Sequence, residues 1–331
     1  MARSEVDVLT IGNAIVDVIA KVDDAFVERN GLVKGSMNLI DEARAEELYN
    51  SMGPAIEISG GSAGNTAAGV ASFGGNAAYF GKIKADQLGG IFRHDMRAQG
   101  VQFDSVAATS GPATARSFIL VTPEGERTMN TYLGACVHLS ESDVDEKIVA
   151  TAKVTYMEGY LWDRQEAKKA FKLAAKIARK AGKLTSITLS DSFCVERHRE
   201  SFLDLIKNDI DIVFANETEI KSLYLTQSFD GALQALRKDC ETAVVTRSAA
   251  GSVVAHGEAV LVVPAIAVPR VVDVTGAGDL YAAGFLFGLT QGIGHARSAQ
   301  LGSLAAAEVI SHVGARPEVN LRQHAKEAGL L

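Results

Sequence analysis

The residues best suited to chemistry form one short run near the end of the chain: Gly276, Ala277, Gly278 and Asp279. They follow a β-branched, extended run, Ile266 to Val272, and precede a small, apolar run, Leu280 to Leu289, that predicts a helix. Amides at a helix N-terminus lack partners within the helix, and the helix dipole adds positive charge, so they bind anions. A carboxylate beside them can accept the proton of a hydroxyl that attacks the anion. The run indicates phosphoryl transfer, although Asp in a first helical turn is also common for its effect on the dipole alone.

A second glycine-rich run also indicates phosphoryl transfer. Gly61, Ser62 and Asn65 lead into small residues that predict a closely packed helix over 66–73. Such a helix aims its N-terminus at a ligand, and the Asn65 amide can both donate to and accept from a sugar hydroxyl. The alternative is a tight turn before a packed helix, with Asn65 as its cap.

Together these runs resemble the two signatures of the PfkB (ribokinase-like) family of carbohydrate and nucleoside kinases. Their order, their separation of roughly 210 residues and the total length of 331 residues all suit that family. The resemblance covers essentially the whole chain. It implies an ATP- and magnesium-dependent phosphotransferase in which Asp279 is the general base and Gly276, Ala277 and Gly278 form the anion hole.

Composition excludes several other classes of protein. The chain is 47% hydrophobic and 22% charged, with a net charge of −7 and no basic stripe, so a nucleic-acid partner is not expected. No apolar run approaches the roughly 20 residues of a membrane helix, and no leader pattern precedes the first strand. Three isolated cysteines, Cys136, Cys194 and Cys240, suggest reduced thiols in the cytoplasm.

Extended and helical patterns alternate along the chain. This alternation predicts an α/β fold with a central, mostly parallel sheet flanked by helices on both faces. Strands are expected at 6–11, 77–82, 117–121, 154–158, 184–189, 212–215 and 242–246. Helices are expected at 42–52, 66–73, 89–99, 164–181, 217–223, 229–239, 279–291 and 295–310.

Two regions break the alternation and read as β-rich insertions. By the family resemblance, residues 14–40 and 109–139 form a small β-sheet lid over the acceptor site. Residues 1–13, 41–108 and 140–331 then form the large α/β domain that binds nucleotide and substrate. A lid suits a kinase, because water in the site would hydrolyse ATP.

The resemblance also assigns the nucleotide side. Asn216 and Glu219 match an Asn-x-x-Glu motif that organises magnesium-bound water, although the same spacing is a helix capping box. Thr246 and Gly251 match a motif that touches nucleotide phosphates, but Ser248 stands where the family usually has glycine. The neighbouring Arg247 suits either a phosphate contact or an exposed salt bridge.

Three further residues are candidates beside the anion hole. Asp273 and Thr275 match two ligand positions of the monovalent cation that many family members bind, and Thr275 is also expected near the nucleotide. Potassium stimulation is therefore an expectation. Arg127 matches a lid arginine that reaches the transferring phosphate, although a solvated turn residue is the alternative.

The acceptor is indicated at the end of the first strand. Asn13 and Asp17 are four residues apart, so on an extended chain they point the same way and can hold a vicinal diol. A polar strand end is the alternative. The pattern Gly-Asn-x-x-x-Asp resembles the adenosine kinase branch, in which Gly61, Ser62 and Asn65 assist and the 5′-hydroxyl faces Asp279. The product would be AMP, and its formation from adenosine would be a reaction of purine salvage.

Apolar residues would enclose the adenine base. The candidates from the lid segments and the strand that follows are Ile15, Met37, Leu39, Leu133 and Ala135, with Tyr160 or Leu161. A sugar kinase of the ribokinase or fructokinase type is the nearest alternative, and a catalytically silent nucleoside sensor is another. A nicotinamide dehydrogenase is disfavoured because no Gly-x-Gly-x-x-Gly follows the first strand. The expected protein is a monomer or homodimer with small-molecule substrates.

Overall fold

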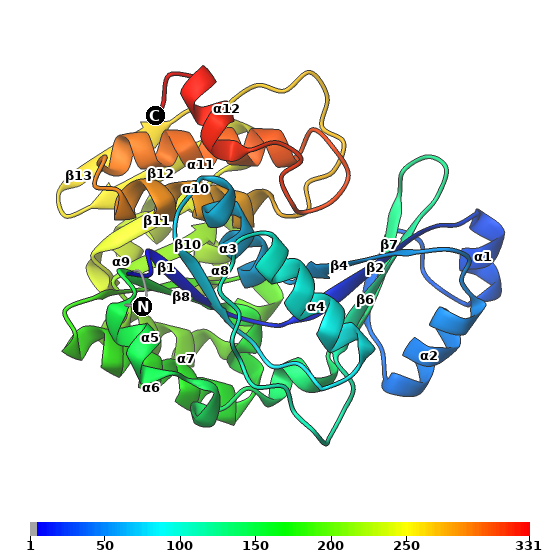
Figure 1. Ribbon diagram of the computed structural model, residues 1–331. Helices are drawn as coiled ribbons and strands as arrows, with labels where there is room; N and C mark the ends of the chain where they lie inside the picture. Colours follow the sequence, from blue (N-terminus) through cyan, green and yellow to red (C-terminus); the bar gives the residue numbers. More distant parts are fainter. Residues whose placement is uncertain (1–4) are drawn as a thin grey trace.

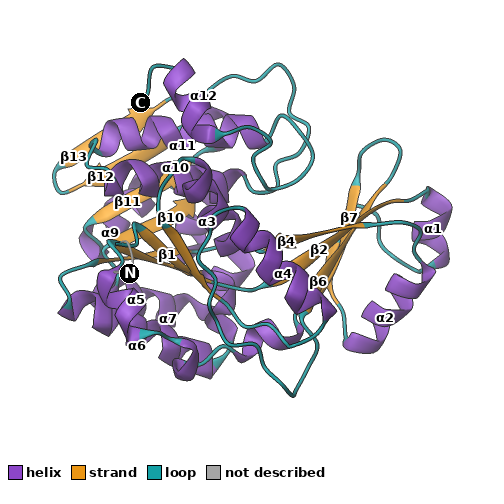
Figure 2. Cartoon of the chain, in the orientation of Figure 1, coloured by secondary structure: helices purple, strands orange, loops and turns teal. Residues whose placement is uncertain are grey.

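Two β-sheets organise residues 5–331, the part of the chain that the computed structural model describes (Figures 1 and 2). The larger sheet runs in the order β13 (Ala259–Val263), β12 (Ser252–His256), β11 (Thr242–Thr246), β10 (Ile212–Asn216), β9 (Leu184–Thr188), β8 (Val154–Glu158), β1 (Val8–Ile11) and β5 (Ala77–Phe80). The strands from β5 to β11 pair in parallel, whereas β12 and β13 pair antiparallel at one edge. The predicted α/β class with a mostly parallel sheet is confirmed.

Helices cover both faces of this sheet because its strands are apolar on both sides. Along β10, Ile212 and Phe214 join one apolar cluster while Val213 and Ala215 join another, as the alternation of a strand requires. The first face carries α3 (Ser62–Ser72), α4 (Gln87–Ala98), α10 (Ala277–Thr290), α11 (His295–Val309) and α12 (Leu321–Glu327). The second carries α5 (Glu146–Thr151), α6 (Gln165–Lys180), α7 (Ser192–Asp209), α8 (Glu217–Leu223) and α9 (Phe229–Asp239).

The smaller sheet lies beside the larger one (Figure 2). Its order is β3 (Met37–Leu39), β7 (Arg127–Tyr132), β6 (Ala115–Val121), β2 (Ile15–Lys21) and β4 (Ile56–Gly60), with α1 (Asp24–Arg29) and α2 (Glu42–Ser51) packed on it. The regions 14–40 and 109–139 supply four of these strands. The fifth, β4, belongs to the segment 41–108 that was assigned to the large domain, yet it joins the smaller sheet because it pairs antiparallel with β2 from Gly60 to Ile56.

Several elements differ from the sequence expectation. Helix α3 begins at Ser62, so Asn65 lies inside its first turn and Gly61 is the N-cap. The extended run 266–272 forms no strand: β13 ends at Val263, and a loop leads to Gly276. Helix α7 was not expected, since polar residues dominate its middle and His198 leaves helical geometry there. Strand β12 was also not expected. Short 3₁₀ helices cover Gly134–His138, Glu141–Asp143, Gly159–Asp163 and Ser248–Ala250.

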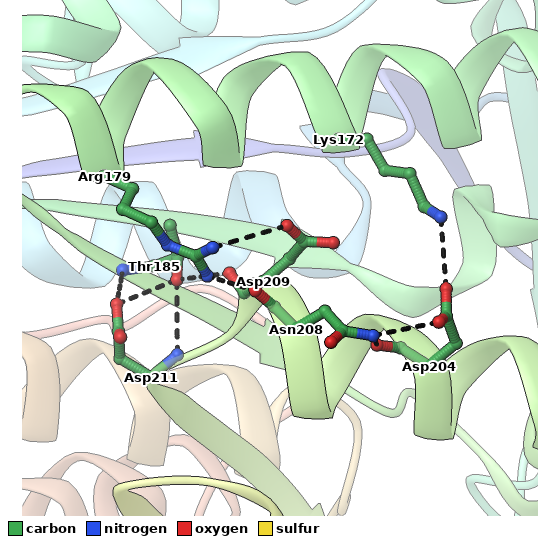
Figure 3. A network of polar contacts seen from close by, with 7 residues as sticks. All are labelled: Lys172, Arg179, Thr185, Asp204, Asn208, Asp209 and Asp211. Atoms are coloured by element: carbon green, nitrogen blue, oxygen red, sulfur yellow. Dashed lines mark hydrogen bonds and ion pairs between the residues drawn. The ribbon is translucent and has the colours of Figure 1, made fainter.

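Polar contacts join α6 to α7 on the outside of the second face (Figure 3). Lys172 pairs with Asp204 at 3.1 Å, and Arg179 donates to the Asn208 carbonyl and lies 4.0 Å from Asp209. The basic run of α6 is thus the polar side of an amphipathic helix, whose other side buries alanines and Phe171. No helix within residues 5–331 has the length and apolar character needed to cross a bilayer.

Candidate active site

A cavity of about 440 Å³ lies between the two sheets. Thr188, Asn216 and Thr246, at the ends of β9, β10 and β11, form its floor, as expected where parallel strands end at their carboxyl side. Strands β2, β6 and β7 of the smaller sheet contribute the opposite wall. Of the residues selected from sequence, the cavity brings together Ile15, Asp17, Gly61, Ser62, Asn65, Tyr160, Asn216, Glu219, Thr246, Thr275, Gly276, Ala277, Gly278 and Asp279.

The Asp279 carboxylate is held by two donors from α3. Ser62 Oγ donates to Oδ1 at 2.6 Å, and Asn65 Nδ2 donates to Oδ2 at 2.8 Å. Burial raises the pKa of Asp279, and the hydrogen bonds from Ser62 and Asn65 partly oppose that rise. The N-termini of α3 and α10 therefore meet at one oriented carboxylate on the cavity wall.

The turn before α10 leaves backbone donors at the cavity. Gly276 has a φ of +79°, and a Cβ there would lie 2.8 Å from Ala315 Cα, so only glycine suits this position. The Ala277 amide donates to Val274 O at 3.2 Å. The amides of Gly278 and Asp279 have no acceptor among the described residues, and a Cβ at Gly278 would meet nothing within 4 Å. The turn thus presents unpaired backbone donors at a helix N-terminus, the arrangement that suits an anion.

Asp17 of β2 lies on the wall formed by the smaller sheet. Its carboxylate rests directly on Gly60, where an added Cβ would stand 2.3 Å from Asp17 Oδ2. Burial raises the pKa of Asp17 to about 7, the charges of Arg316 and Arg127 lower it, and Asp279 raises it further. Asp17 and Asp279 are thus both carboxyl groups of the cavity that burial makes more basic than usual.

The structure separates Asn13 from Asp17. Asn13 lies in the connection between β1 and β2, is 3% exposed and does not line the cavity. Its Nδ2 donates to Glu158 Oε1 at 2.7 Å, and the Ala63 amide donates to Oε2 of the same carboxylate at 2.9 Å. Glu158, at the end of β8, therefore joins the first strand to the start of α3. Burial raises its pKa to about 7, and the hydrogen bonds from Ala63 and Asn13 oppose the rise.

Two residues at this site were not indicated by the sequence patterns, the buried Glu158 and the half-buried Arg316. Arg316 donates to Ser59 O at 2.9 Å and to the Gly64 carbonyl, so it fixes both ends of the Gly61–Asn65 segment. Glu158 left one signal, a carboxylate at the end of an apolar strand. Arg316 left none, because it is a single arginine in a loop.

Asn216 and Glu219 form the capping box that their spacing allows. Asn216 Oδ1 accepts from the Glu219 amide at 2.9 Å, while Glu219 accepts from the Asn216 amide at 2.9 Å and from its Nδ2 at 2.6 Å. Both residues also line the cavity. Burial raises the pKa of Glu219 to about 7, against the backbone hydrogen bond from Asn216. Asn216 and Glu219 thus cap helix α8 and also form part of the cavity wall.

In the turn after β11, Ser248 occupies the position where the family usually has glycine, and its backbone keeps a conformation that favours glycine. Ser248 has a φ of +49°, a left-handed conformation that glycine adopts more easily. Gly251 accepts from the Arg247 amide at 2.7 Å and lies off the cavity wall, whereas Thr246 lies on it. Arg247 pairs with Glu217 at 2.8 Å and stands over the Phe229 ring. The salt-bridge alternative for Arg247 is thus present.

The proposed base-binding residues do not gather in one place. Met37 and Leu39 are 53% and 64% exposed on the edge strand β3, and Ala135 is buried outside the cavity. A second hollow of about 490 Å³ is lined by Leu39, Leu133, Leu161 and Tyr160, among others. It shares Thr131 and Tyr160 with the main cavity, so the two hollows adjoin.

The remaining candidates lie at the edge of the cavity. Arg127, the first residue of β7, pairs with Asp273 Oδ2 at 2.6 Å, and its Nη1 lies 3.3 Å from Thr275 Oγ1. Only Thr275 of these three residues lines the cavity. Arg127 thus contacts the loop that leads into α10, and it is not a solvated turn residue.

Comparison with known proteins agrees with this geometry. The profile of the pfkB family carbohydrate kinases matches residues 7–321. A probable sugar kinase from Rhizobium etli CFN 42 is 55% identical with a TM-score of 0.91, covering 99% of each chain. An adenosine kinase from Sinorhizobium meliloti is 58% identical with a TM-score of 0.90, covering 98% of this chain and 100% of that one. The probable fructokinase-6, chloroplastic, of Arabidopsis thaliana is 29% identical over 69% of this chain but only 61% of its own length.

Proposed function

The chain belongs to the pfkB family of carbohydrate kinases, and on this premise we propose that it transfers the γ-phosphoryl group of ATP to the 5′-hydroxyl of adenosine. The observation that carries the proposal is the position of Asp279. Its carboxylate is hydrogen-bonded to Ser62 and Asn65, follows the open amides of α10, and shares one cavity with Asp17.

The chemistry follows from these groups. Asp279 accepts the proton of the 5′-hydroxyl while the hydroxyl oxygen attacks the γ-phosphorus. The bond from that phosphorus to the bridging oxygen of ADP breaks, so the products are AMP and ADP. The amides of Gly278 and Asp279 donate to oxygens of the transferring group, where negative charge must be stabilised. Asp17 accepts from the ribose hydroxyls and fixes the distance of attack.

Asn216 and Glu219 suit magnesium held through water. A carboxylate has about four lone-pair sites, and Glu219 uses two of them for Asn216, so two remain for metal-bound water. Bound magnesium would neutralise phosphate charge, and it usually keeps several of its waters. The residues fit that role without a direct protein cage, and no cluster of three acidic, His or Cys ligands exists within residues 5–331.

Adenosine is favoured by the hollow beside the cavity. Leu133 and Leu161 give that hollow apolar walls, and Tyr160 connects it to the cavity that holds Asp17. A ribose at Asp17 could thus extend its base past Tyr160 into an apolar slot. A free sugar has no group that would fill this slot.

A sugar kinase is the second candidate, and one feature favours it. Ser117 and Thr131 place a pair of hydroxyls 2.7 Å apart on the wall contributed by the smaller sheet. Together with Asp17, they offer the polar contacts that a sugar needs. The similarity to a probable sugar kinase points the same way.

A coupled ATP-consumption assay with adenosine, guanosine, cytidine, ribose and fructose separates these candidates. Asp279→Asn serves as the background for spontaneous ATP hydrolysis. We expect the highest kcat/KM with adenosine. A clear preference for ribose or fructose would replace the adenosine assignment and leave the kinase assignment in place. ATP consumption at the same rate with and without any added acceptor would contradict both assignments.

A further inference from the structure

Arg127 and Asp273 form an ion pair between the smaller sheet and the loop that leads into α10. Arg127 Nη1 lies 2.6 Å from Asp273 Oδ2, and the two side chains are 11% and 7% exposed. Asp273 stands three residues before Gly276 in the loop that leads into α10. The pair therefore joins strand β7 to the segment whose amides would receive the phosphate.

The acceptor sites of Asp273 are fully used by the protein. Oδ1 accepts from the Thr275 amide at 3.1 Å and from its hydroxyl at 2.7 Å, while Oδ2 accepts from the Gly314 amide at 2.9 Å and from Arg127. A carboxylate offers about four lone-pair sites, and here four donors meet them. The Thr275 hydroxyl oxygen also accepts a hydrogen bond from Arg127 Nη1 at 3.3 Å.

A monovalent cation does not fit this arrangement. Asp273 and Thr275 are the side-chain ligands that the family resemblance implies for such a cation. A potassium ion at Asp273 would have to displace Arg127 from Oδ2, or else place a second positive charge beside a nearly buried guanidinium. Like charges at such a distance repel strongly where water is scarce.

We propose that the Arg127 guanidinium takes the place of a monovalent cation at Asp273. It neutralises the carboxylate and fixes the Asp273–Thr275 loop, so Arg127 acts as a positioning residue for the amides that follow. Its Nη2 is buried and has no partner among the described residues. Met129 and Thr131, on the same face of β7 by strand alternation, line the cavity.

Thermal unfolding in potassium chloride and in choline chloride of equal ionic strength tests this proposal without any substrate. A cation that binds only the native state raises the melting temperature. The wild type should melt equally in both salts, whereas Arg127→Ala, with Oδ2 vacated, should be stabilised by potassium alone. Arg44→Ala is the matched control, since Arg44 pairs with Glu47 on α2 and does not touch Asp273. Arg127→Gln, which keeps most of the stem, replaces the alanine variant if that protein does not fold.

The rate gives the second readout, and it alone rests on the proposed kinase function. Wild-type kcat should agree within about twofold in potassium, sodium and choline, and Arg127→Ala should lose at least about tenfold and recover part of it in potassium only. Potassium-specific stabilisation or activation of the wild type would overturn the proposal. The proposal would also be overturned if potassium changed neither the melting temperature nor the kcat of Arg127→Ala. An inactive wild type would contradict the kinase assignment, while the melting experiment would still decide the role of Arg127.

Discussion

Asn65 of α3 donates from Nδ2 to Asp279 Oδ2 of α10 at 2.8 Å, which joins the first turns of two helices that are far apart in the sequence. Ser62 donates to the other carboxylate oxygen at 2.6 Å. These residues were selected from sequence as sugar-binding candidates. In the structure they donate hydrogen bonds to Asp279, the residue proposed as the general base. A substrate that contacts Ser62 or Asn65 must therefore bind beside these hydrogen bonds.

Replacing Asp279 with asparagine should remove proton acceptance and preserve shape. We expect kcat to fall by ~10²–10⁴-fold, the usual contribution of a positioned base, with an unchanged far-ultraviolet circular dichroism spectrum. Steady-state rates with adenosine and ATP provide the measurement. Asp24→Asn, at an exposed position of α1, is the control. Wild-type turnover in a folded Asp279→Asn protein would eliminate the general-base assignment.

Removing the Asn65 donor should move the pH dependence in a defined direction. The hydrogen bond from Asn65 lowers the raised pKa of Asp279, so Asn65→Ala should raise that pKa further. Since the base works when ionised, the acidic limb of kcat/KM against pH should move to higher pH. Profiles of wild type and Asn65→Ala, measured in the same buffers, check this. A limb that stays in place or moves to lower pH would show that Asn65 does not tune the base.

Asp17 should limit both activity and stability through its pKa of about 7. Between the unfolded value near 3.8 and about 7, the native state binds more protons at Asp17 than the unfolded chain does, so stability falls as pH rises through that window. Asp17→Asn should therefore raise the melting temperature of the free protein at about pH 8 by ~2 °C or more, and this gain should shrink toward about pH 4. The same variant should increase KM for adenosine. A lower melting temperature at about pH 8 would show that the charge of Asp17 is well compensated in the native state.

Ser248 stands in a left-handed conformation that glycine tolerates better. Ser248→Gly should stabilise the protein by about 0.5–1 kcal/mol in urea unfolding, since relief of the backbone outweighs the added freedom of the unfolded chain. Ala249→Gly, in the same turn but without a positive φ, should instead destabilise it. Equal effects of the two substitutions would mean that the conformation of Ser248 carries no strain.

The local motifs were the most predictable part of this molecule. The run from Gly276 to Asp279 carries its geometry in adjacent residues, because small side chains, a helix start and a carboxylate act over one turn. The parallel sheet followed equally from alternating apolar runs. In contrast, the loop before Gly276 was expected to be extended structure. Its valines have strand propensity, but the segment pairs with no strand among the described residues, and Val271 and Val272 are exposed.

Contacts between distant segments could not be read from the sequence. Glu158 and Arg316 are single residues whose roles appear only when β8 and the loop after α11 meet the start of α3. Arg127 and Asp273 were each selected, but for different ligands, and nothing in their spacing indicated that they would bind one another. Asn13 shows the same limit, since its side chain contacts Glu158 and not the cavity.

The most direct test of the proposed reaction is phosphorus-31 NMR of one reaction that contains magnesium, ATP and equal concentrations of adenosine, ribose and fructose. We expect 5′-AMP and ADP in equal amounts with no sugar phosphate, and a ~10²–10⁴-fold slower appearance of both products with Asp279→Asn. Sugar phosphate with adenosine unconsumed would contradict the adenosine assignment, and inorganic phosphate as the sole new product besides ADP would contradict phosphoryl transfer to an acceptor hydroxyl.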